Sequence, residues 1–130
     1  MGKRVLVVDD DPDVRLFNTT VLEENGYSPE EAVNGEEALQ SIRAAPPDLV
    51  LLDVLMPRQS GVRLYRALKT DPALQAVKVV VLSGITRTSF LKSQQALAEF
   101  DGRPVPEPEC YLEKPVDAEV LAAAVKQAIG

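Results

Sequence analysis

The sequence contains no histidine, no tryptophan and a single cysteine, Cys110. One cysteine excludes an internal disulfide, and the absence of histidine disfavours zinc, copper and iron sites, which commonly use imidazole ligands. The formal net charge is -6, yet like charges never gather into a long run. We therefore expect neither an acidic tail nor a basic patch that binds nucleic acid directly.

Long apolar stretches are also missing. The longest apolar runs fall far short of a membrane span, and the first residues lack the basic-then-apolar layout of a signal peptide. The 130 residues, with 45% apolar and 26% charged residues, are an ordinary globular mix of the usual size for one domain. We expect a single domain over residues 1–130, located in the cytoplasm and without membrane contact.

Short apolar runs rich in β-branched residues alternate with longer segments of helical period. Strands are expected at residues 5–8, 27–33, 49–52, 77–82 and 110–112, each followed by a helix. Pro29 places the second strand at a sheet edge, where proline is best tolerated. In the fourth helix, expected from about Thr88 to Phe100, the predicted inward positions are Leu91, Leu97 and Ala98.

Strands that alternate with helices run parallel, and right-handed crossovers then place helices on both faces of one sheet. The predicted fold class is therefore α/β, a single doubly wound (βα)5 domain. In such sheets ligands bind outside the carboxyl ends of the strands. Polar residues stand at these ends: Asp9 and Asp10 after the first strand, Asp53 after the third, Ser83 at the fourth and Lys114 after the fifth. We expect them to converge on one edge of the sheet.

Three carboxylates gathered in a partly desolvated crevice repel one another unless a positive charge lies among them. Mg2+ is the leading candidate, because the candidate ligands are all oxygens and Mg2+ commonly completes its shell with water and phosphate oxygen. A phosphoryl group is therefore the expected ligand. Lys114 offers it a positive charge and Ser83 a hydroxyl donor, and Asp53 is the candidate nucleophile.

Four motifs follow one another along the chain: VLVVDDD, DLVLLDVLMP, VVVLSG and YLEKP. In this order they resemble the receiver domain of bacterial two-component response regulators, over a span from about Lys3 to Ile129. The resemblance implies a flavodoxin/CheY-like sheet of five parallel strands in the order 2-1-3-4-5. It also implies a phosphorylation-dependent signalling switch rather than an enzyme, with a sensor histidine kinase or histidine phosphotransfer protein as the donor to Asp53.

The resemblance further implies a role for each site residue. In this family Asp10 binds Mg2+ directly, Asp9 binds it through water, and Leu55 contributes its backbone carbonyl. Lys114 contacts the phosphoryl group, and the bond from Lys114 to Pro115 is a candidate cis peptide.

Ser83 and Tyr111 stand where the family has its switch hydroxyl and switch aromatic. In the family the hydroxyl moves toward the phosphoryl group while the aromatic turns inward. The movement reshapes the last two βα units as a surface for a downstream protein partner.

The sequence departs from the family pattern at two places. A proline-rich segment, about residues 101–109, lengthens the interval before the last strand. It is either a partner-specific extension or a tolerated insertion, and the low thermodynamic cost of surface insertions favours the second. Leu55 and Ile85 are apolar at positions that tune access of the hydrolytic water, which suggests slow self-dephosphorylation.

Two other functions stay open. A pseudo-receiver would keep the fold as an interaction module without using phosphorylation, although the intact Asp10, Asp53 and Lys114 argue against it. A small phosphatase acting through an aspartyl phosphate lacks a second acid two residues beyond the nucleophile, where Leu55 stands. Either a stand-alone regulator or a receiver excised from a larger protein fits this sequence.

Overall fold

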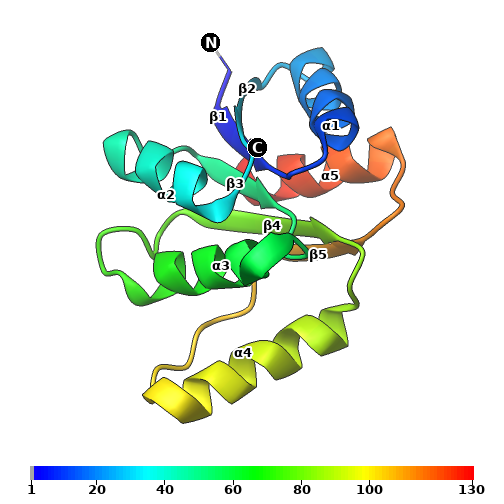
Figure 1. The fold of residues 1–130 in the computed structure, drawn as a ribbon. Coiled ribbons are helices and arrows are strands. Elements are labelled where there is room, and N and C mark those ends of the chain that lie inside the picture. The colour runs from blue at the N-terminus through cyan, green and yellow to red at the C-terminus, as the bar shows by residue number, and fades with distance from the viewer. Residues whose placement is uncertain (1) are drawn as a thin grey trace.

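The computed structural model describes residues 2–130, in which strands and helices alternate (Figure 1). The elements are β1 (Arg4–Val8), α1 (Pro12–Glu24), β2 (Ser28–Ala32), α2 (Gly35–Ala44), β3 (Leu49–Leu52), a 3-10 turn (Pro57–Gln59), α3 (Ser60–Thr70), β4 (Lys78–Ser83), α4 (Arg87–Asp101), β5 (Cys110–Glu113) and α5 (Ala118–Ile129). Within this described part of the chain, no helix has the length and apolar character needed to cross a membrane.

All strand pairs are parallel, and the strand order is β2-β1-β3-β4-β5. The predicted fold class and strand order are therefore confirmed, and the strand that contains Pro29 lies at an edge as expected. Helices α1 and α5 cover one face of the sheet, and α2, α3 and α4 cover the other (Figure 1). Each face has its own hydrophobic core.

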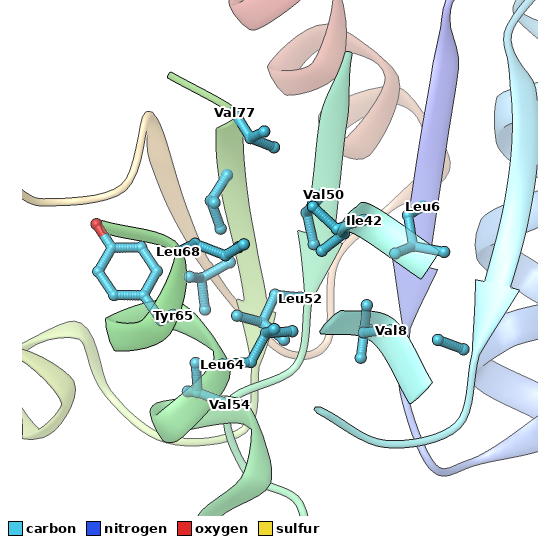
Figure 2. Packing of buried hydrophobic residues seen from close by; sticks show 14 of the residues in the cluster. Leu6, Val8, Ile42, Val50, Leu52, Val54, Leu64, Tyr65, Leu68 and Val77 are labelled. Atoms are coloured by element: carbon cyan, nitrogen blue, oxygen red, sulfur yellow. The ribbon is translucent and has the colours of Figure 1, made fainter. Parts of the chain in front are cut away.

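The central strands are apolar throughout because both of their faces are covered. Along β1, Val5 and Val7 pack with α1 and α5, whereas Leu6 and Val8 point to the opposite face. Figure 2 shows part of the hydrophobic cluster on this opposite face, in which Leu6, Val8 and Val50 of the sheet lie against residues of α2 and α3. The rigid central strands bring their carboxyl ends to one edge, where the polar residues stand.

Local signals fix the ends of α1. The side chain of Asp11 accepts hydrogen bonds from the backbone N–H groups of Asp13 and Val14, and Pro12 occupies the first turn. Asn25 caps the other end, and Gly26 follows with a φ of 85°, which favours glycine. This capped helix begins directly after the acidic residues Asp9 and Asp10.

Helix α4 differs from the prediction in its buried positions. It begins at Arg87 and ends at Asp101, and its buried residues are Phe90 and Gln94. Leu91, Leu97 and Ala98, which were predicted to face inward, are only half-buried. The apolar pattern was misleading because a glutamine occupies the buried face one turn after Phe90.

Candidate functional site

The carboxyl ends of four neighbouring strands bring the predicted polar residues together. Backbone hydrogen bonds hold this alignment: the N–H of Asp53 donates to the carbonyl of Val8 (3.0 Å), and the N–H of Lys114 donates to the carbonyl of Ser83 (2.8 Å). Asp53 thus lies beside the end of β1, and Lys114 lies beside the end of β4. The structure thus brings the polar residues together at one edge of the sheet, as predicted.

The close approach of α3 helps to position Asp53. A Cβ atom on Gly61 would lie 2.4 Å from the carbonyl oxygen of Asp53 and 2.6 Å from the Cα of Val54. Only glycine therefore permits the N-terminus of α3 to pack against this backbone. The backbone N–H of Leu55 donates to Oδ1 of Asp53 (2.8 Å) and orients the carboxylate.

Lys114 lies between two buried carboxylates. Its Nζ is 3.0 Å from Oδ2 of Asp9 and 3.2 Å from Oδ2 of Asp53, whose exposed fractions are 2% and 6%. Burial lowers the pKa of the Lys114 ammonium, but the hydrogen bond to Asp9 and the charges of Asp53 and Asp9 outweigh burial and raise the pKa above its ordinary value. Lys114 is therefore positively charged at neutral pH. The peptide bond from Lys114 to Pro115 is cis, as anticipated.

Three carboxylates are close enough to share one cation. Asp9, Asp10 and Asp53 each offer an oxygen, and these oxygens lie within 4.8 Å of one another. Asp10 is exposed to solvent, whereas Asp9 is fixed by Lys114 and by the backbone N–H of Asp11 (2.9 Å). A set of hard oxygen donors fits a hard divalent cation such as Mg2+.

Ser83 and Tyr111 meet at the loop that leads to α4. The hydroxyl of Ser83 is fully buried and donates to Oδ1 of Asp53 (2.7 Å). The hydroxyl of Tyr111 donates to the carbonyl of Ile85 (2.8 Å), and its ring lies against Phe90. Burial, followed by the charges of Glu113 and Asp53, raises the pKa of Tyr111 to about 12. The two residues thus connect Asp53 to the start of α4.

Sequence reasoning missed two arginines beside this site. Arg15, one turn into α1, donates to the backbone carbonyl of Asp9 (2.8 Å) and to the carboxylate of Glu31 (3.1 Å). Arg58 has a φ of 61°, a left-handed conformation uncommon for a residue with a side chain. A cleft of about 500 Å3 lies next to Asp10 and is lined in part by Arg58. The helical spacing from Asp11 was a usable signal for Arg15; nothing in the sequence indicated the strain at Arg58.

A doubly wound parallel sheet with an acidic crevice, a buried hydroxyl and a lysine at its carboxyl edge defines a class of phosphoryl-binding switch domains. Comparison with known families gives the same result, because the profile of the response regulator receiver domain matches residues 5–126. The chain belongs to this family. Its function is accordingly that of a phosphorylation-dependent signalling switch, and the pseudo-receiver alternative is not favoured.

Individual proteins and structures similar to this chain support the same family. Protein Rrf1 of Nitratidesulfovibrio vulgaris is 29% identical over 99% of this chain and 84% of its own length. Protein PilH of Pseudomonas aeruginosa is 30% identical over 94% of this chain and 93% of its own length. The structure of a putative response regulator from Chloroflexus aurantiacus superposes with a TM-score of 0.79 and 29% identity, covering 99% of this chain and 98% of that one. This chain spans only 11% to 37% of the length of some other relatives.

Proposed function

We propose that this receiver accepts a phosphoryl group on Asp53 from a histidine kinase or a histidine phosphotransfer protein. The observation that carries the proposal is the position of the Asp53 carboxylate, which lies 2.7 Å from the Ser83 hydroxyl and 3.2 Å from the Lys114 ammonium. In the transfer, the phosphorus–nitrogen bond of the donor phosphohistidine breaks and a phosphorus–oxygen bond to Asp53 forms. Lys114 and Ser83 then hold the phosphoryl oxygens through charge and hydrogen bonding.

The acidic residues have distinct proposed roles. Asp10 and Asp53 would bind Mg2+ directly, Asp9 through a water molecule, and Leu55 through its backbone carbonyl. When bound, Mg2+ offsets the negative charge of the carboxylates and of the incoming phosphoryl group. The exposure of Asp10 supports its role, because its carboxylate is accessible to a hydrated ion. Asp9 is buried and held by Lys114, which suits a residue that orients the others.

Ser83 and Tyr111 are the proposed switch residues. Ser83 contacts Asp53 directly, and Tyr111 donates to the Ile85 carbonyl in the loop before α4. A phosphoryl group on Asp53 would bias these side chains between two arrangements and alter the α4–β5–α5 face, to which a downstream protein binds. We place this switch in the cytoplasm, working through protein contacts and without direct nucleic-acid or membrane binding.

The donor protein needs a surface beside Asp53, and exposed apolar side chains provide one. Leu55, two residues beyond the acceptor, is 58% exposed, and Leu16 and Phe17 on α1 are 65% and 44% exposed. Exposed apolar side chains of this kind gain free energy when a partner removes them from water. We propose that the donor covers the carboxyl edge of the sheet together with α1.

The test is intact mass after incubation with Mg2+ and acetyl phosphate. The parent is expected to gain one phosphoryl group, Asp53→Asn to gain none, and Asp117→Asn, at the start of α5, to behave as the parent. Omission of Mg2+ is expected to remove the adduct. An adduct that persists in Asp53→Asn would contradict the assignment. The absence of an adduct, together with failure to bind beryllofluoride, would favour a pseudo-receiver.

A further inference from the structure

Three aromatic side chains form a continuous line from Tyr111 of the switch, through Phe90 of α4, to Tyr65 in the middle of α3. The Tyr111 and Phe90 ring centroids are 5.5 Å apart at an interplanar angle of 43°, and those of Phe90 and Tyr65 are 5.2 Å apart at 79°. Tyr65 and Phe90 are fully buried. Because such packed rings cannot be displaced independently, a movement of Tyr111 must be accommodated by Phe90 and Tyr65.

The line ends at the loop of residues 102–109. The hydroxyl of Tyr65 donates to the backbone carbonyl of Pro106. Figure 2 shows this hydroxyl pointing away from the other labelled side chains of the cluster. Sequence reasoning favoured a tolerated surface insertion for this segment, but its backbone is in contact with the most deeply buried tyrosine of the protein.

Further contacts hold the loop against α3 and β4. The guanidinium of Arg66 donates to the carboxylate of Asp101 (Nε to Oδ2, 3.0 Å) and to the carbonyl of Arg103. Val105 packs against the hydrophobic cluster of the same face, and the N–H of Glu109 donates to the carbonyl of Val79 (2.8 Å). The loop is therefore a docked element with a defined position, and its release would require these contacts to break.

A separate connection joins the loop to the start of α4. The guanidinium of Arg87 pairs with Glu107 of the loop, and the backbone N–H of Arg87 lies 3.4 Å from the carboxylate of Glu113 on β5. Both charged side chains of the ion pair are exposed, so their pairing contributes little by itself. The aromatic line is therefore the principal route from the switch to the loop.

We propose that loop 102–109 is a second readout of the switch, whose docking on α3 depends on the position of Tyr111 through Phe90 and Tyr65. This inference rests on the proposed function. In the present structure Ser83 contacts Asp53, Tyr111 packs inward and the loop is docked, so the three features belong to one state. A phosphoryl group that stabilises the inward position of Tyr111 therefore also stabilises the docked loop. When the phosphoryl group is lost, the loop presents a different surface.

The experiment is amide hydrogen exchange of residues 102–109 with and without beryllofluoride and Mg2+. In the parent, beryllofluoride is expected to slow exchange at Val105 and Glu109 by at least about fivefold, the lower end of typical coupling between sites. Tyr65→Phe keeps the ring and removes only the hydroxyl. In this variant the ratio of the exchange rates without and with beryllofluoride is expected to be close to one. Tyr27→Phe, on the opposite face of the sheet, is the matched control and is expected to keep the parent ratio.

Bound beryllofluoride is followed in the same samples by its fluorine resonance, and Asp53 phosphorylation by intact mass. Binding without any change in loop exchange in the parent would overturn the inference and leave the proposed function intact. No binding, together with no phosphoryl adduct on Asp53, would overturn both. A parent-like ratio in Tyr65→Phe would exclude Tyr65 as the link. Phe90→Leu, which interrupts the line at its centre, is expected to lower the ratio in the same way while keeping an apolar side chain in the core.

Discussion

Helices α3 and α4 are neighbours on the same face of the sheet, but they are held there by different amounts of buried surface. Six of the 11 residues of α3 are buried, compared with two of the 15 residues of α4. The strands beneath them differ in the same direction, because β3 and most of β4 are buried whereas β5 is half-buried or exposed. Elements with little buried apolar surface open and shift at low cost. Helix α3 is thus a firmly held support for Asp53, whereas α4 is the helix that can shift at lower cost.

Buried polar groups occur on both helices, and α3 also has some without a partner, because Ser60 Oγ and Arg66 Nη1 have no hydrogen-bond partner among the described residues. Lys69 of α3 is buried, but its ammonium donates to the carbonyls of Val77 (2.7 Å) and Gln75 (3.2 Å). Burial lowers the pKa of Lys69, and the charge of Glu109 opposes this effect. Gln94 of α4 is 5% exposed, and neither its Oε1 nor its Nε2 has a hydrogen-bond partner among the described residues. The position of α4 therefore carries a desolvation penalty that is not offset.

The largest expected effect compares one leucine from each helix. Leu68→Ala on α3 removes a fully buried side chain and is expected to lower the free energy of unfolding by about 3 kcal/mol. Leu97→Ala on α4 removes a half-buried one and is expected to cost less than about 1 kcal/mol. Urea unfolding followed by circular dichroism measures both. Equal losses would show that α4 is held as firmly as α3.

A smaller effect, of opposite sign, is expected at Gln94. Gln94→Met replaces the unpartnered amide by an apolar group of similar shape and is expected to raise the free energy of unfolding by about 1 kcal/mol. Gln95→Met at the exposed neighbouring position is the control and is expected to change it by less than about 0.5 kcal/mol. The same urea titrations measure both variants. A loss of stability in Gln94→Met would mean that the amide has a stabilising partner.

The last effect concerns Tyr111 and is absent at neutral pH, because it appears only at alkaline pH. An unfolded tyrosine loses its proton near pH 10, but burial holds the pKa of Tyr111 at about 12 in the folded protein. Between these values the unfolded state binds fewer protons, so stability falls as the pH rises. Tyr111→Phe is expected to make the decline from pH 10 to 12 shallower, as measured by urea unfolding at several pH values. Parallel declines in parent and variant would place Tyr111 in a more exposed position.

Much of the fold was predictable because the physics that fixes it is local or topological. The runs at β1, β3 and β4 are apolar because both faces of the sheet are covered, and such runs can be recognised in the amino-acid sequence. The convergence of Asp9, Asp53 and Lys114 followed from parallel topology alone, since the carboxyl ends of parallel strands share an edge. The roles proposed for these residues remain predictions that phosphorylation chemistry will test.

Other features were not predictable for an equally physical reason. The buried face of α4 carries Gln94, so a search for apolar periodicity selected Leu91 and Leu97 in its place. The loop of residues 102–109 was interpreted as a tolerated insertion because the residues that anchor it are distant in sequence; Tyr65 and Pro106 are separated by 41 positions. Pairing across such distances leaves no local pattern.

The sequence by itself determined the alternation of strands and helices, the edge at which the acidic residues meet and the family to which the chain is similar, because these depend on residue type and spacing. Only the tertiary structure decided that the aromatic side chains of α3, α4 and β5 pack in one line, and that the line ends on a docked loop. Close packing between distant segments selects one arrangement from many that the same pattern allows.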